Sequence, residues 1–413
     1  MNVPHRRQQL KPRLSEARAV IRRIGIAIPV AAVIGSAVAL FLKSLDLATV
    51  ARWNNPWLLY LLPVAGLIVG WIYHRFGRSV EGGNTLIIDR IHDAGGGVPA
   101  RMAPLVFAGT VITHLFGGSA GREGTAVQMG GSIASAFGGW LRLDPDDLRF
   151  LLMSGVAAGF GAVFGTPVTG AVFAMEVLAI RRISHIGLLP CLAAAVTGDL
   201  VCTAWGITHT RYHIGGAGGV HINPLLLAKV AAAAIAFGLA SVLFTELAHG
   251  LSRFFKRMFP HAPVRAAVGG IIIVALVSLL GTRDYLGLGV TSPDPHAVTI
   301  VSAFTAGGAD PWSWWWKILF TAITLGSGFK GGEVTPLFFI GACLGNTMAH
   351  LLGAPADLFA GIGFVAVFGG AANTPLACAI MGLELFGAEH AVYIAAGCCI
   401  AYIFSGRSGI YRS

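Results

Sequence analysis

Three glycine-rich stretches of this chain carry polar and ionisable side chains that could bind an anion. They read EGGNTLI at residues 81–87, GREGTAV at residues 121–127 and GGEVTPL at residues 331–337. In each, glycine backbone is followed by a potential helix, whose first N–H groups lack intrahelical partners and carry roughly half a positive charge. Helix ends of this kind stabilise an anion without a full positive charge, so the anion is also able to leave.

The second stretch contains a carboxylate, Glu123, beside the predicted start of its helix. An isolated carboxylate is costly at membrane depth, and this cost indicates a function. In its charged form Glu123 could occupy the anion path and imitate the anion. In its protonated form it could swing away, and so act as both gate and proton carrier. The alternative is a structural carboxylate paired with Arg122.

Membrane helices are the elements that must position these stretches. The 413 residues are 55% hydrophobic and only 12% charged, whereas soluble proteins have about 25% charged residues. Residues 24–42 and 57–73 carry no charge and are long enough to span a bilayer. The fold class is therefore predicted to be all-α integral membrane. Further candidate spans are 186–205, 230–245, 266–281, 336–352, 358–368 and 392–404.

The net charge of +10 is better explained by membrane topology than by nucleic-acid binding. Basic residues lie in loops between apolar segments, as the positive-inside rule requires. The same rule places both termini in the cytoplasm, and the segment LRLDPDDLRF at residues 141–150, which is mixed in charge, is predicted to face outward. We expect residues 1–23 to form a basic cytoplasmic segment and residues 24–413 a single transport domain.

Neither enzymatic chemistry nor a metal site is predicted. The cysteines lie in apolar stretches without metal-ligand spacing, and no nucleophile–base constellation appears at bilayer depth. We therefore expect no enzyme activity, no cofactor and no metal. The cysteines in question are Cys191, Cys202, Cys343, Cys378, Cys398 and Cys399.

An internal repeat divides the transport domain into two halves, at about residues 24–206 and 224–404. In each half a Thr-Pro pair is followed by a glutamate nine residues after the proline, Glu176 in the first half and Glu384 in the second. Duplicated halves with glycine-interrupted helices are typical of transporters that bind substrate near the midplane. We expect both glutamates to cap or bridge helices, with a proton role for Glu176 as the alternative.

Four motifs together resemble the CLC family of chloride channels and chloride/proton antiporters. GREGT is similar to the family's GREGP signature, and GGEVTP is similar to its GGxFxP stretch. GTPVTGAVFAMEV resembles the family's N-A-P helix with a glutamate, and FSGRSGIY at residues 404–411 resembles the stretch with the anion-coordinating tyrosine. The resemblance implies an inverted repeat of full and half-membrane helices, and a homodimer with one anion path in each subunit.

Departures from the chloride-type pattern resemble the fluoride-selective CLC-F branch. The serine of the family's GSGIP stretch is missing here, GREGP has become GREGT, and Val334 and Thr335 stand at the third stretch. The resemblance implies a fluoride/proton antiporter of the inner (plasma) membrane, which exports fluoride by inward proton movement and so gives fluoride resistance. Chloride would be a weak second substrate. The alternatives are a chloride/proton antiporter and a passive anion channel of the same fold.

The resemblance also implies a set of anion-binding residues. For Asn84 the alternative is a helix N-cap, and for Thr335 it is an N-cap before Pro336, which we expect in the first helical turn. For Tyr411 the alternative is an interfacial aromatic anchor. The anion-binding set is Gly83, Asn84, Gly124, Thr125, Val334, Thr335 and Tyr411.

Three further residues near the third stretch allow two interpretations each. The positive ring edges of Phe338 and Phe339 could line the anion pathway, or both rings could serve helix packing. Glu333 could be a second proton relay or a surface carboxylate at the cavity mouth. The internal proton route is not defined by these residues.

Overall fold

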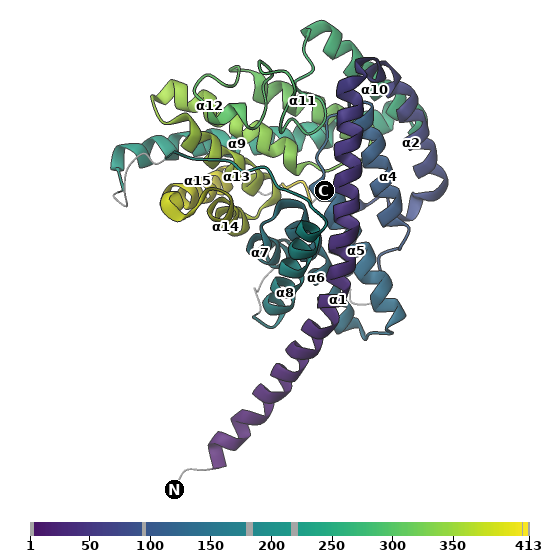
Figure 1. The fold of residues 1–413 in the computed structure, drawn as a ribbon, viewed down its shortest axis with the longest axis vertical. Coiled ribbons are helices and arrows are strands. Elements are labelled where there is room, and N and C mark those ends of the chain that lie inside the picture. The colour runs from purple at the N-terminus through teal and green to yellow at the C-terminus, as the bar shows by residue number, and fades with distance from the viewer. Residues whose placement is uncertain (1–3, 93–95, 179–184, 216–221, 407, 412–413) are drawn as a thin grey trace.

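The described part of the computed structural model is built almost wholly from α-helices (Figure 1). It comprises residues 4–92, 96–178, 185–215, 222–406 and 408–411. The helices are α1 (Pro4–Asn54), α2 (Leu62–Phe76), α3 (Gly83–His92), α4 (Met102–Leu115), α5 (Glu123–Trp140), α6 (Pro145–Phe164), α7 (Pro167–Leu178), α8 (His185–Ala204), α9 (Pro224–Met258), α10 (Ala262–Leu280), α11 (Ser313–Gly326), α12 (Val334–Leu352), α13 (Ala356–Ala372), α14 (Pro375–Phe386) and α15 (Ala391–Phe404).

Seven of these helices are long and apolar enough to cross a bilayer, which confirms a multi-pass membrane protein. The predicted spans missed one of them, α6, whose first turn holds Asp146 and Asp147. They also did not include the shorter apolar helices α4, α7 and α14. The residues predicted at 358–368 and 392–404 lie in two further helices that are apolar but shorter. The seven candidate spans are Glu16–Asn54, Pro56–Phe76, Pro145–Phe164, Gly187–Ala204, Pro224–Met258, Ala262–Leu280 and Val334–Leu352.

The segment at residues 141–150 lies on the side of the molecule where α1 begins, so the prediction that it faces away from the basic N-terminal segment is wrong. The Asp147 carboxylate, at the start of α6, pairs with Arg22, and it accepts a hydrogen bond from Arg23 Nε at 2.9 Å. Acidic residues in this segment therefore pair with Arg22 and Arg23, the last two residues of the basic segment. Figure 1 shows the N-terminal end of α1 extending beyond the other helices.

Helices α6 and α13 form the centre of the molecule. Residues 151–163 of α6 and 358–372 of α13 are all buried. A helix that is apolar on every side is expected inside a large helical assembly. These two helices occupy equivalent places in the sequence repeat, which accounts for their similar surroundings.

Glycine pairs let each central helix approach the helix before it. A Cβ on Gly130 of α5 would overlap the carbonyl of Gly155 on α6, and a Cβ on Gly341 of α12 would overlap the carbonyl of Gly363 on α13. Small residues at helix crossings permit such close backbone contact in membranes. The two crossings correspond, because Gly130 and Gly341 each lie seven residues after the first residue of their helix.

We predict that Gly130→Ala lowers the thermal stability of the purified protein, because the added methyl group has no space at the α5–α6 crossing. Overpacking of this kind costs about 1–3 kcal/mol. Gly139→Ala, in the same helix, is the matched control, since nothing lies within 4 Å of a Cβ there. Melting in detergent should drop by several degrees for Gly130→Ala alone; equal melting of both variants would contradict the packing argument.

Candidate functional site

The starts of α5 and α12 meet at one antiparallel backbone pair. Gly121 N donates to Gly332 O at 2.6 Å, and Gly332 N donates to Gly121 O at 2.8 Å. Only glycine fits at position 332, because a Cβ there would lie 2.8 Å from Gly124 N. The pair aligns two helix N-termini, both of which carry unpaired N–H groups.

Glu123 lies at this junction as the first residue of α5, and only 1% of it is exposed. Its Oε2 accepts hydrogen bonds from Thr335 N at 3.0 Å and from Arg122 N at 3.1 Å. Its Oε1 accepts a bond from the Thr335 hydroxyl at 2.5 Å. The carboxylate of one half therefore occupies an anion position at the start of the other half's helix, α12.

Arg122 contributes less to Glu123 than the alternative interpretation of a simple ion pair requires. Arg122 Nε lies 3.7 Å from Glu123 Oε1 and makes no hydrogen bond to the described residues. Side-chain donation to the carboxylate thus comes from Thr335. The N-cap interpretation of Thr335 is wrong, because Glu333 holds the N-cap position of α12 and Thr335 is its second residue.

The first glycine-rich stretch also converges on this junction. A Cβ on Gly124 would lie 3.2 Å both from Asn84 Nδ2 and from Gly332 Cα. Asn84 is the second residue of α3, so the N-cap interpretation is wrong here too. Its Oδ1 is buried and has no hydrogen-bond partner among the described residues. The structure therefore brings all three predicted stretches together around Gly124, with an unsatisfied amide at their meeting point.

Gly83 and Val334 lie at the starts of their helices, as predicted, whereas the Thr125 side chain faces a different neighbour. Gly83, with a φ of 53°, begins α3, and the buried Val334 begins α12. The Thr125 hydroxyl pairs with the Thr110 hydroxyl of α4 at 2.8 Å. Thr125 thus joins α5 to α4 and does not contact the Glu123 carboxylate.

The two phenylalanines after Thr335 point into different surroundings. Phe338 stacks on Phe364 with ring centroids 3.8 Å apart. The Phe339 ring lies instead near Tyr285, at 6.2 Å, and under the ammonium of Lys317, at 5.2 Å. Both rings take part in helix packing, and Phe338 does so within one aromatic cluster. Other rings near Phe338 are Phe164 and Phe368.

Tyr411 reaches the same aromatic cluster from the C-terminal end of the chain. Its ring lies edge-on to Phe173 at 6.1 Å, and Phe173 stacks near Phe368 at 5.9 Å. Backbone pairing of Ile410 N with Ala371 O at 2.9 Å holds this terminal segment against α13. Tyr411 is half-buried, and it packs against protein, as a residue of an internal path would.

Glu176 and Glu384 form a reciprocal pair of helix caps, which confirms the prediction that they bridge helices. Glu176, near the end of α7, accepts bonds from Leu376 N at 3.1 Å and Ala377 N at 2.7 Å, at the start of α14. Glu384, near the end of α14, accepts bonds from Val168 N at 3.0 Å and Thr169 N at 2.7 Å, at the start of α7. The two halves thus satisfy each other's helix termini.

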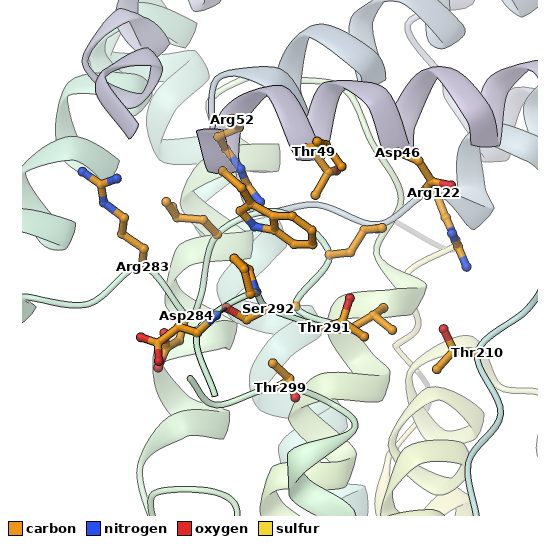
Figure 2. Close-up of a pocket in the computed structure, with 18 of the residues that line it drawn as sticks. Asp46, Thr49, Arg52, Arg122, Thr210, Arg283, Asp284, Thr291, Ser292 and Thr299 are labelled. Atoms are coloured by element: carbon orange, nitrogen blue, oxygen red, sulfur yellow. Dashed lines mark hydrogen bonds between the residues drawn. The ribbon is translucent and has the colours of Figure 1, made fainter. Parts of the chain in front are cut away.

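A cavity of about 740 Å³ opens beside the Glu123 site (Figure 2). Most of its lining comes from α1 residues 42–53, residues 206–210, residues 281–294 and Arg122. Arg122 therefore lies between the cavity and the Glu123 carboxylate. Sequence analysis missed two cations near this cavity, the half-buried Arg52 and the buried Lys317. Charged residues within apolar, tryptophan-rich segments were the available signal.

Comparisons with known proteins agree with this architecture. The chain matches the family model described as voltage gated chloride channel over residues 65–406. A chloride/fluoride channel protein of Pseudomonas syringae pv. tomato is 50% identical over 390 residues, which are 93% of this chain and 84% of the relative.

Two solved structures share the fold. A CLC-type fluoride/proton antiporter has a TM-score of 0.88 and 33% identity, and the match covers 95% of this chain and 97% of that one. A slow cyanobacterial Cl-/H+ antiporter has a TM-score of 0.79 and 19% identity, covering 94% and 96%. The second likeness concerns the fold alone.

We predict that Thr335→Val slows fluoride efflux from liposomes at a fixed pH gradient, because the hydroxyl that now binds the Glu123 carboxylate is lost as a donor for the anion that would replace it. A hydrogen bond to a charged group is worth about 1.5–3 kcal/mol, so the change in rate should be at least about tenfold. Thr335→Ser keeps the hydroxyl and should stay near the wild-type rate. Wild-type flux in Thr335→Val would show that the hydroxyl has no role in transport.

Proposed function

We propose that this chain, which belongs to the voltage-gated chloride channel family, exports fluoride from the cytoplasm in exchange for inward-moving protons. The observation that carries the proposal is the buried Glu123 carboxylate, held by the backbone N–H and hydroxyl of Thr335 at the start of α12. A gate that imitates the anion couples anion binding to protonation. The similar proteins whose names include fluoride support the choice of anion.

Exchange follows from the competition of one carboxylate and one anion for the same donors. While charged, Glu123 occupies the donors of Thr335 and closes the path. Protonation removes the charge and weakens the charge-assisted bonds, so the side chain leaves and fluoride accepts those bonds in its place. Release of the proton on the other side returns the carboxylate, which expels the anion. Each cycle thus moves an anion and a proton in opposite directions.

Fluoride selectivity is assigned to close hydrogen-bond donors. Fluoride is small and strongly hydrated, so replacing its water needs donors at short range. Thr335 offers a hydroxyl, Asn84 offers an amide beside Gly124, and the glycine backbones of Gly83 and Gly124 allow close approach. A chloride/proton antiporter is the second candidate, since one protein of this fold is a Cl-/H+ antiporter by name.

Toward the cytoplasm, the path is proposed to pass Phe338 and the Tyr411 hydroxyl. Support comes from the chain of ring contacts that joins these two residues through Phe368 and Phe173. Thr125 contributes backbone, because its hydroxyl is used by Thr110. Phe339 supports the site from the opposite side, next to Lys317.

The transport domain is proposed to consist of two inverted repeats, at about residues 24–206 and 224–404, within a homodimer. Support comes from the corresponding glycine crossings and the reciprocal caps of Glu176 and Glu384. We place the protein in the inner (plasma) membrane with both termini in the cytoplasm, because the N-terminal end of α1 is basic.

The first test measures proton-driven fluoride movement in liposomes with an imposed pH gradient and a potassium ionophore as electrical shunt. Wild-type protein should move fluoride uphill and chloride weakly, and Glu123→Gln should abolish the uphill component, because an amide cannot exchange a proton. Fluoride that only follows its own gradient in wild-type protein would indicate a channel. Equal or faster chloride movement would indicate the chloride antiporter.

A second test concerns Glu333, which we propose as the inner proton relay. It is half-buried immediately before α12, and its carboxylate forms no hydrogen bond or ion pair with other described residues, although its backbone carbonyl accepts a bond from Leu337 N. We predict that Glu333→Gln keeps passive fluoride flux but loses uphill fluoride movement. The matched control is the exposed Glu389, whose change to glutamine should leave coupling intact. Full coupling in Glu333→Gln would return this residue to a structural role.

A further inference from the structure

The cavity beside Arg122 lies on the membrane side opposite the basic start of α1, because its lining includes the last turns of that membrane-spanning helix. Under the proposed function, an anion that passes Glu123 outward enters this space, because Arg122 lines it. With about 740 Å³, the cavity can hold an anion together with several waters. Its charged lining decides whether the anion leaves at once or stays.

Most charged groups of this cavity have protein partners or face water. Asp46 lies near Arg122 and interacts with it electrostatically (Figure 2). Asp284 accepts a bond from Val298 N at 3.1 Å, and Asp294 accepts one from His296 N at 2.9 Å. The remaining titratable groups are Lys43 and Arg283, both exposed, and His209, which lies 3.9 Å from Asp199.

Arg52 differs from these groups. Its guanidinium forms no hydrogen bond or ion pair with any described residue, and its Nη1 is fully buried. It lies against backbone, since a Cβ on Gly287 would be 2.8 Å from Nη1 and 2.9 Å from Nη2. Arg52 lies in the last turn of α1, where the helix dipole favours a cation. The dipole does not, however, provide hydrogen-bond acceptors for the five N–H donors of the guanidinium. Such unmet capacity in a partly buried arginine is costly unless a ligand meets it.

A second uncompensated cation lies behind the same backbone segment. Lys317 is 0% exposed and donates to Gly287 O at 2.8 Å and to Tyr285 O at 3.1 Å. No carboxylate pairs with it among the described residues. Arg52 and Lys317 thus contact the same short segment, residues 285–289, and their positive potential adds at the cavity wall.

We infer that the cavity contains a second anion-binding station centred on the Arg52 guanidinium, which holds a monovalent halide ion between the Glu123 site and open water. Lys317 acts as a positioning residue that fixes the 285–289 backbone and adds to the potential. The inference deepens the proposed function, since this station would receive the exported anion. It rests on the cavity's own charges, so it can be tested without transport.

Trp53 lines the same cavity and provides a local probe. We would measure quenching of tryptophan fluorescence by iodide at constant ionic strength in the full-length protein in detergent. The difference between proteins with Trp53 and with Trp53→Phe isolates this residue. We expect saturable quenching by iodide that added fluoride or chloride reverses. Quenching by neutral acrylamide serves to show that access to Trp53 is the same in each variant.

Arg52→Gln should raise the half-saturating iodide concentration by on the order of tenfold, as loss of a charge-assisted contact implies. The control is Arg283→Gln, which removes the same charge from the exposed arginine of the cavity; Arg283 points away from Arg52 in Figure 2. This variant should change the half-saturating iodide concentration by less than about twofold. Arg52→Lys keeps the positive charge, so it should bind iodide more tightly than Arg52→Gln. This comparison separates the loss of charge from any structural effect of the substitution. Non-saturable quenching, or equal shifts for both glutamine variants, would overturn the inference.

The proposed function and this station can fail separately. Glu123→Gln should leave iodide binding at Trp53 unchanged, because the station does not include the gate. Saturable binding that depends on Arg52, in a protein without proton-driven fluoride movement, would keep the station and reject the antiporter. Coupled transport with no Arg52-dependent binding would reject the station alone.

Discussion

The pairing of two glycine backbones, Gly121 with Gly332, is the constraint on which the site depends. Non-helical backbone at membrane depth must have its polar groups satisfied by protein, and here each interrupted segment satisfies the other. A Cβ on Gly121 would lie 3.0 Å from Gly332 O and 2.8 Å from Glu123 Oε2. Any larger side chain would therefore separate the two helix starts and disperse the donors that surround Glu123.

Much of the remaining structure holds these two helix starts in register. The glycine crossings set the distance from α5 and α12 to the central helices, and the caps of Glu176 and Glu384 tie α7 to α14. Ser119, just before the junction, is bound by Thr324 through its N–H at 3.1 Å and by Thr321 through its hydroxyl at 3.0 Å. These contacts are rigid and buried, as a preorganised anion site requires.

Local patterns predicted the elements of the site, and long-range contacts decided how they are used. Glycine followed by apolar residues was sufficient to predict the starts of three helices, and the repeat predicted the roles of Glu176 and Glu384. The bond between Thr335 and Glu123 joins residues 212 positions apart, which spacing cannot reveal. The side of segment 141–150 was mispredicted because its own mixed charge hid the pairing of Asp147 with Arg22 and Arg23.

The frame is nearly symmetric, but its chemistry is not. Counted from the paired glycines, Glu123 of the first half corresponds to Val334 of the second, and Gly124 corresponds to Thr335. One half thus supplies the carboxylate and the other supplies the hydroxyl that binds it. A second carboxylate at the position of Thr335 would repel Glu123 in a low-dielectric site. One carboxylate with donors on the facing helix is the arrangement that the proposed exchange of an anion for a proton requires.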